Sequence, residues 1–293
     1  MNSFSPFIII PGVILFFFVS CTDSTYRELS LSDSLTFYAS FENGFKADFS
    51  MGDSTLYIAH SWTRRSEAVP FYSQTEHLQI SEGEGRYGNA LWIDNSYTPV
   101  YFYKGKDNML YTDHHWEGTV SFWLRLSPDE DLHEGYSDPI QLTTRAWNDG
   151  ALFVDFTDVS PRIFRFAFFP DRDTWDPGYR DWDDVPFEER PMVEITEPLF
   201  THDEWVHVAF AFSNFNTGNN DGVVKGYING ELYGSLTGRE QTFTWEPAEL
   251  AIWLGYNYRG YFDELAIFNR ALSLEEIAFI YSLEHGLQYL FED

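Results

Sequence analysis

Apolar and polar residues alternate with a period of two along several segments of the chain. Such alternation is typical of β-strands, in which successive side chains point to opposite faces. In residues 118–126, 162–169 and 205–213, apolar side chains share one face of each predicted strand: Val120, Phe122, Leu124, Leu126, Phe164, Phe166, Phe168, Val206, Val208, Phe210 and Phe212. Aromatic residues also stand on the opposite faces, so we expect a second sheet on one side and loops on the other.

Local turn and capping signals complete this pattern. Asn229-Gly230 separates two apolar runs, and this dipeptide favours the type I′ turn of a hairpin. Only residues 273–281 predict a helix, because Ser273 and Glu276 form a capping box before an apolar stripe. Many strands beside one short C-terminal helix predict an all-β domain, with Phe122, Leu124, Val208, Phe210, Leu265 and Ile267 in one core.

The N-terminal segment differs from the rest of the chain. Residues 1–20 carry no charge, and their apolar run is broken by Pro11 and Gly12. The run is shorter than the ~20 residues that a membrane-spanning helix needs, and it is typical of an export signal. It ends at Cys21, the only cysteine, and Phe18-Val19-Ser20-Cys21 resembles the lipobox of bacterial lipoproteins. We therefore expect a signal peptide over 1–20, a lipidated polar tether over 21–34, and one exported, envelope-anchored domain over 35–293.

The composition of the chain limits the classes of partner that it can bind. The chain has 46 acidic and 18 basic residues, a net charge of -28, and 19% aromatic residues. Nucleic acids are excluded as partners, because phosphate binding depends on clustered Lys and Arg. Anionic polysaccharides are disfavoured for the same reason.

Five segments in order carry a family resemblance. They are residues 88–94 (GNALWID), 119–125 (TVSFWLR), 205–209 (WVHVA), 226–230 (GYING) and 260–265 (GYFDEL), the last followed by 269–277. Together they resemble the laminin-G-like (concanavalin A-like lectin/glucanase) family, which implies a two-sheet jelly-roll sandwich. The fold hosts lectins, adhesion modules and glycosidases alike, so the resemblance does not decide function.

The resemblance also implies a calcium ion, because jelly rolls of this family often hold one where the first and last strands meet. Asp263 would be the ligand from the final strand, and Glu42 the ligand near the first strand. Oxygen ligands of this kind suit Ca²⁺. The alternative is that Asp263 accepts hydrogen bonds from backbone amides.

No catalytic residues can be named. The glucanase spacing Glu-x-Asp-x-x-Glu, which would aim three carboxylates into a cleft, does not occur in the chain. The chain therefore resembles a non-catalytic binding module more than an enzyme. A glycan-cleaving enzyme with dispersed carboxylates and a protein-binding adhesion module remain the alternatives.

A long segment, residues 171–190, mixes large aromatic and acidic side chains. Trp175, Tyr179 and Trp182 lie among six aspartates, and Trp147 stands at another predicted turn. Aromatic faces stack on sugar rings and carboxylates accept hydroxyl hydrogen bonds, so these four aromatic residues are candidates for binding a neutral glycan. The same residues could instead fold the loop onto the sheet.

The lone cysteine gives a first test. We expect Cys21→Ser to release the protein from membranes, because the acyl chains would supply its strong hydrophobic anchor. Membrane fractionation after a high-salt wash measures this. Continued membrane binding by the Cys21→Ser protein would contradict the anchor.

Overall fold

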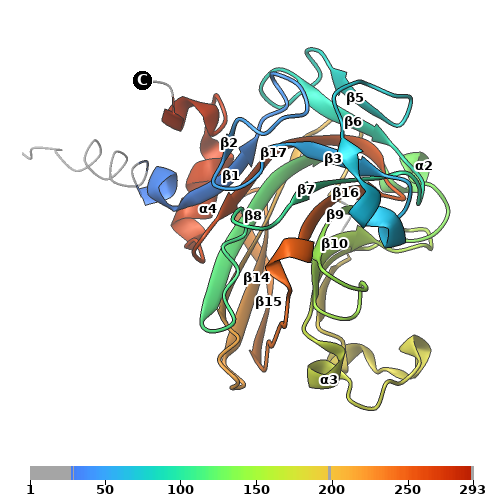
Figure 1. Ribbon diagram of the computed structural model, residues 1–293, viewed down its shortest axis with the longest axis vertical. Helices are drawn as coiled ribbons and strands as arrows, with labels where there is room; N and C mark the ends of the chain where they lie inside the picture. Colours follow the sequence, from blue (N-terminus) through green and yellow to red (C-terminus); the bar gives the residue numbers. More distant parts are fainter. Residues whose placement is uncertain (1–27, 29, 197–198, 292–293) are drawn as a thin grey trace, which may run out of the picture.

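The computed structural model describes residues 28, 30–196 and 199–291. The predicted signal peptide and Cys21 lie outside the described residues. Two antiparallel sheets pack face to face (Figure 1). The all-β jelly-roll prediction is confirmed, and strands dominate the described chain.

Nine strands form the first sheet within the described chain. They are β1 (Leu35–Ala39), β2 (Phe49–Ser50), β5 (Leu78–Ser81), β6 (Ala90–Asp94), β8 (Trp116–Arg125), β13 (Val206–Phe215), β14 (Gly222–Ile228), β15 (Glu231–Arg239) and β17 (Arg259–Phe268). Their order is β15-β14-β13-β8-β17-β1-β2, and the β5-β6 pair joins the sheet through β17. The first and last strands, β1 and β17, are therefore neighbours.

Eight strands of the described chain form the second sheet, in the order β12-β11-β10-β9-β16-β7-β3-β4. Their bounds are β3 (Leu56–Ala59), β4 (Val69–Pro70), β7 (Val100–Lys104), β9 (Ser137–Thr143), β10 (Ala151–Phe156), β11 (Phe164–Phe169), β12 (Met192–Ile195) and β16 (Ala251–Tyr256). The helices are short: α2 (Pro128–Asp131), α3 (Arg172–Trp175), α4 (Leu274–Ser282), η1 (Trp62–Glu67), η2 (Trp182–Asp184), η3 (Phe187–Glu189), η4 (Pro247–Glu249) and η5 (Gln288–Phe291).

The alternation read from the sequence places the core correctly. The apolar faces of β8, β13 and β11 all lie in one cluster between the sheets, and so do Leu265 and Ile267 of β17. Aromatic rings pack edge to face across this space. The ring centroids of Phe168 and Phe210, for example, are 5.5 Å apart. The predicted common core is confirmed.

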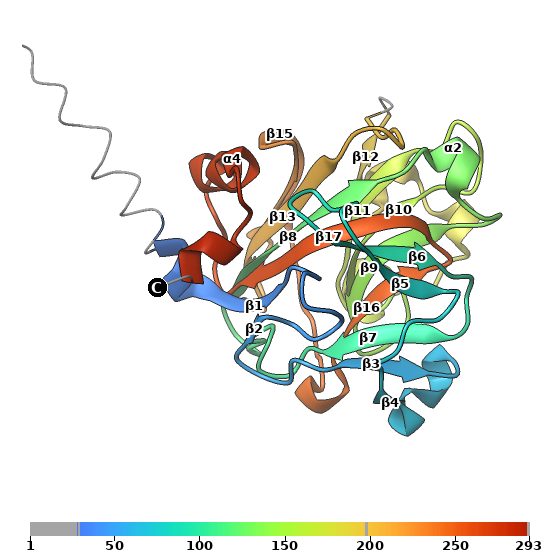
Figure 2. The ribbon, with the colours of Figure 1, turned by 90° about the horizontal axis from the view of Figure 1, so that it is seen from above.

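The hairpin and the helix also form as predicted. Asn229 and Gly230 both have positive φ angles between β14 and β15. Ser273 caps α4, and the reciprocal bonds with Glu276 complete the capping box. In Figure 2, α4 lies beside β15, on the side of the first sheet that faces away from the second sheet. The short helices α2 and α3 were not predicted, since four residues are too few to show a period.

Packing begins before Leu35, within the segment predicted as a polar tether. Leu31 is fully buried and Ser34 is nearly so, and Leu31 packs with Ile277 and Ile280 of α4. These residues of the expected polar tether therefore belong to the packed domain. Among the described residues, no helix has the length and apolar character needed to cross a bilayer.

The second sheet carries side chains on both faces. Its inner face contributes Ile140, Leu142, Leu152, Val154 and Phe166 to the core. We call the other side its outer face, and the residues between those of the core project there. Loops cover this outer face, including the segment 170–191 between β11 and β12, which carries α3 beyond the ends of β10 (Figure 1).

The core supplies a stability test. Phe210 is completely buried, so we expect Phe210→Ala to lower the free energy of unfolding by ~3–5 kcal/mol, because it leaves a cavity. Denaturant unfolding of both proteins measures the difference. Tyr179→Ala is the matched aromatic control, because Tyr179 is 61% exposed and should change stability little. Equal effects of the two changes would contradict this account of the core.

Candidate functional site

The outer face of the second sheet holds a pocket of about 320 Å³. We call it the outer-face pocket. Its floor comes from β9, β10 and β11, and its walls come from the loops around them. The lining residues are Tyr97, Gly135, Tyr136, Asp138, Gln141, Trp147, Phe153, Asp155, Arg165, Trp182, Met192 and Tyr256. This volume lies within the range of small-ligand sites.

A buried ion pair lies in the floor. Arg165 of β11 and Asp155 of β10 are direct cross-strand partners, and they are 5% and 2% exposed. The guanidinium binds the carboxylate through two nitrogens, with 2.8 Å from Nε to Oδ1. Burial opposes the charge on Arg165, yet its hydrogen bonds to Asp155 and the charge of that carboxylate raise the pKa of the guanidinium. The two charges therefore neutralise each other.

Asp138 has no such partner. It is 7% exposed and lines the pocket, and among the described residues no group donates a hydrogen bond to its carboxyl or pairs with it. Burial, together with the nearby charge of Asp155, raises the pKa of Asp138 well above its usual range. A buried polar group without a partner is costly in a folded protein, and such groups occur where a ligand completes them.

A local irregularity turns Asp138 outward. Simple alternation would place it on the inner face with Ile140 and Leu142. The register between β9 and β10 shifts, however, so that Ser137 instead pairs with the core residue Phe156. Bulges of this kind re-aim side chains and are common beside functional sites.

Gln141 adds a second unpartnered group to the same floor. Its side chain is nearly inaccessible, and its Nε2 is buried with no hydrogen-bond acceptor in the described structure. Asp138 and Gln141 therefore offer an oxygen and a nitrogen to whatever occupies the pocket. Both come from β9, one strand of a rigid sheet, which fixes their separation.

Aromatic rings form the walls in two perpendicular pairs. Trp147 and Trp182 have ring centroids 5.2 Å apart, and Tyr97 and Tyr256 have centroids 5.1 Å apart. Three of the lining rings remain accessible, with Tyr97 44%, Tyr136 41% and Trp147 40% exposed. The pocket thus combines accessible aromatic faces with polar groups at its floor.

The structure divides the four aromatic candidates from the sequence. Trp147 and Trp182 line the outer-face pocket. Trp175 packs against Phe169 and donates its Nε1 hydrogen to the Asn148 carbonyl, so it helps to fold the loop. Tyr179 is exposed and binds Asp173 in the same loop, away from the pocket lining.

Two acids of the 171–190 loop hold its shape. Asp176 is buried and accepts hydrogen bonds from Arg172 and Arg180. Asp171 binds Arg145 and the Thr244 side chain, which fixes the start of the loop against a distant segment. These carboxylates are occupied, so they are not available to a sugar.

The sequence did not single out Asp138, Gln141, Asp155 or Arg165. A usable signal existed for Asp155 and Arg165, since charged residues interrupt strands that are otherwise apolar on both faces. Asp138 could not be found in this way, because its orientation depends on the register shift.

The two calcium candidates come together at another corner of the molecule. Glu42 accepts a hydrogen bond from the Asn89 amide, and Asp263 accepts bonds from the amides of Arg86 and Glu264. Gly88 permits this approach, because a Cβ there would lie 2.4 Å from Glu42 Oε1. The two acids thus bind backbone amides of the 86–89 loop and of β17, as the alternative reading of Asp263 expected.

The resemblance implies a calcium ion held by these two acids together with backbone carbonyls. In the described part of the chain, no three His, Cys, Asp or Glu residues are placed to hold a metal ion. Burial and the neighbouring carboxyl of Glu264 raise the pKa of Asp263, and burial raises that of Glu264 to about 7. Calcium binding stays a prediction from the resemblance.

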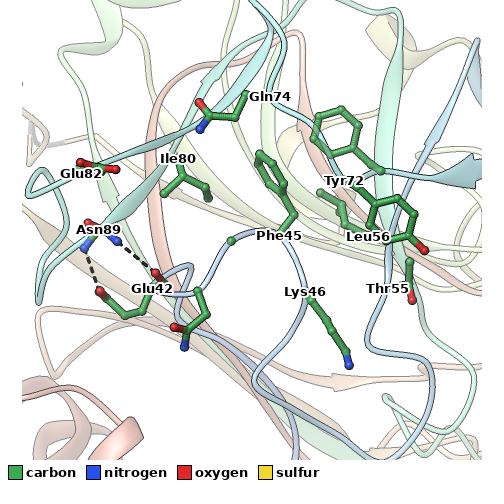
Figure 3. Close-up of a pocket in the computed structure, with 13 residues that line it drawn as sticks. Glu42, Phe45, Lys46, Thr55, Leu56, Tyr72, Gln74, Ile80, Glu82 and Asn89 are labelled. Atoms are coloured by element: carbon green, nitrogen blue, oxygen red, sulfur yellow. Dashed lines mark hydrogen bonds between the residues drawn. The ribbon is translucent and has the colours of Figure 1, made fainter.

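A second pocket of about 410 Å³ opens beside this corner (Figure 3). Glu42 points to Asn89 in its wall, and both hydrogen bonds between them are satisfied. Its other polar side chains, such as Lys46, Gln74 and Glu82, are exposed to water. It lacks the buried unpartnered groups of the outer-face pocket and is the weaker candidate.

The model of the concanavalin A-like lectin/glucanases superfamily matches residues 104–278, more than half of the chain. No curated protein matches the sequence.

Solved structures share the fold. The binding domain of botulinum neurotoxin serotype D has a TM-score of 0.55 at 17% identity, and that of neurotoxin DC in complex with SialylT has 0.55 at 11%. Each match covers 86% of this chain but 52% of the toxin structure, so the chain spans about half the length of those domains. Domain 4 of a GH43 extracellular arabinanase from Geobacillus stearothermophilus, in complex with arabinotriose, has a TM-score of 0.48 at 18% identity and matches over 84% of this chain and 97% of that one.

The raised pKa of Asp138 predicts how stability depends on pH. Below the pKa of Asp138 in the unfolded chain, ~3.9, this side chain makes its full contribution to stability. That contribution is lost as the pH rises through the higher pKa of the folded state, because folding buries the ionised form. We therefore expect Asp138→Asn to raise the free energy of unfolding by ~1–3 kcal/mol at neutral pH. This gain in the free energy of unfolding should disappear at about pH 3.5, since both proteins are then neutral at this position. Unfolding curves at both pH values measure it, and a loss of stability at neutral pH would contradict the prediction.

Proposed function

The chain belongs to the concanavalin A-like lectin/glucanase superfamily, and from this premise we propose that it is a non-catalytic carbohydrate-binding domain. Its site is the outer-face pocket. A pocket of this volume receives a short sugar or one end of a longer glycan.

One observation carries the proposal: the Asp138 carboxyl, to which no described group donates a hydrogen bond, and the buried, unpartnered Nε2 of Gln141 lie in a pocket walled by accessible aromatic rings. Sugars present apolar C–H faces together with hydroxyl groups that both donate and accept hydrogen bonds. The aromatic faces suit the first feature, and the floor groups suit the second. An apolar ligand would leave the floor groups unsatisfied.

Glycan cleavage is a second candidate, and it is favoured by one observation. Asp138 and Asp155 both line the pocket, and glycosidases use a pair of carboxyl groups. The bidentate bond from Arg165, however, occupies Asp155. Only Asp138 is then available, which supports binding over cleavage. Release of reducing ends by the wild-type protein but not by Asp138→Asn would establish the enzyme instead.

The proposal includes attachment to the cell envelope through a lipid on Cys21. The support for this comes from the sequence, in which the only cysteine follows an apolar, uncharged leader. Binding sugars from an anchored position would hold the protein close to a glycan at the cell surface. A protein-binding adhesion role has less support, because the candidate site is concave and lined with polar groups.

The proposal is tested at Trp147, the most accessible tryptophan of the pocket wall. We expect Trp147→Ala to weaken binding of a glycan identified on an array by about tenfold, equivalent to ~1.4 kcal/mol, because a stacking face is lost. Titration calorimetry measures the affinity. Gln141→Ala should weaken binding as well, through the lost Nε2 donor.

Tyr179→Ala is the matched control, because Tyr179 is an exposed aromatic residue outside the pocket lining. The affinity of the Tyr179→Ala protein for the glycan should equal that of the wild type. If Tyr179→Ala lost binding while Trp147→Ala retained it, the site would lie on the 171–190 loop and the outer-face pocket would be rejected.

A further inference from the structure

The charge of the outer-face pocket is unbalanced. Arg165 is neutralised by Asp155, which binds it through both oxygens, and its guanidinium also lies 5.0 Å from the Tyr136 ring centre. Asp138 is left with no cation of its own among the described residues. An ionised Asp138 therefore gives the floor a net negative charge.

The surrounding elements do not correct this imbalance. The groups that act electrostatically on Asp138, on the Asp155–Arg165 pair or on Tyr136 are Asp158 after β10, Glu194 on β12, Tyr256 on β16 and Arg190 at the end of the loop. Arg190 is already occupied, since it lies over the Trp182 ring and donates to two backbone carbonyls. With Asp138 ionised, four carboxylates face two guanidinium groups.

The walls add to the attraction for a cation. Tyr97, Tyr136, Trp147, Trp182 and Tyr256 surround the pocket, and the negative faces of such rings attract positive charge. A carboxyl group at the floor of an aromatic pocket is the arrangement that recognises an ammonium group. The sequence favoured neutral glycans because the chain is strongly acidic, and the same acidity favours a cationic sugar more.

We propose that the outer-face pocket selects amine-bearing sugars, whose ammonium group pairs with Asp138 while the sugar ring packs against the aromatic walls. This inference rests on the proposed function. Gln141 Nε2 then donates to a hydroxyl of the same sugar. The ammonium supplies the hydrogen-bond donors that the Asp138 carboxyl lacks in the free protein.

The pairing predicts a pH dependence that neutral sugars do not share. An ammonium ion stabilises the ionised form of Asp138. The affinity of the protein for an amine-bearing sugar therefore rises with pH until the amine loses its proton at about pH 7.7. A neutral sugar binds beside the protonated form of Asp138. The affinity of the protein for a neutral sugar therefore falls as this buried acid ionises.

The experiment uses matched triads of sugars that differ at one carbon. Oligosaccharides of glucosamine, N-acetylglucosamine and glucose with the same linkage, and the corresponding galactose series, are titrated into the full chain at about pH 6.5, where the amine is protonated. We expect the amine member of a bound triad to bind about tenfold or more tightly than its acetylated and hydroxyl counterparts.

Two variants locate the effect. Asp138→Asn keeps the shape of the acid and removes its charge, so the ratio of the amine affinity to the affinities of the other two members should fall to about one. Asp107→Asn removes the same charge from an exposed position outside the pocket lining and outside the groups that act on the floor, and it should keep the preference. Equal losses in the two variants would assign the preference to overall charge and overturn the role of Asp138.

The outcomes separate this inference from the function on which it rests. If neutral sugars bind, depend on Trp147 and are preferred over amines, the carbohydrate site stands and the selectivity proposal fails. If no member of any triad or of a wider glycan array binds, the proposed function itself fails.

Discussion

Strands β9, β10 and β11 of the second sheet are buried on both faces, and the candidate site depends on this constraint. Its inner face packs against the first sheet, so strands β9, β10 and β11 are fixed in position by the aromatic core. Its outer face is covered by loops, which pack Trp175 and Trp182 against Phe169 of β11 and leave the outer-face pocket beside them. Because the floor belongs to the rigid sheet, its polar groups are held in place before any ligand arrives.

The polar groups in the floor of the outer-face pocket lower the stability of the fold. A buried ion pair such as Asp155–Arg165 gains little net stability, since removing both charges from water costs nearly as much as their attraction returns. Gln141 Nε2 is buried without an acceptor, and no group in the described structure donates a hydrogen bond to the Asp138 carboxyl. A large core of close-packed aromatic residues compensates for this cost. Unfavourable polar burial concentrated in one pocket is the pattern expected where binding, and not stability, determines the residues.

The corner formed by Glu42 and Asp263 shows a different use of buried acids. Both carboxylates accept hydrogen bonds from backbone amides, and Glu264 does the same for the amide of Leu287 while it binds the Tyr38 hydroxyl. These bonds join β1, the 86–89 loop, β17 and the C-terminal segment. Satisfied acids of this kind stabilise the closure of the two chain ends, whereas Asp138 has nothing comparable.

The sequence by itself determined the class of fold, the core strands, the hairpin at Asn229-Gly230 and the capped helix α4, because each depends on a local pattern of two to nine residues. It also selected Trp147 and Trp182, which share a pocket, but it could not separate them from Trp175 and Tyr179. Only the tertiary structure decided that separation, because packing against Phe169 and bonds within the loop determine which rings remain accessible. The position of Asp138 is the clearest case: alternation points it into the core, and a register shift against β10 turns it into the pocket. Pairing between strands sets that register, and the alternation of side chains along β9 does not.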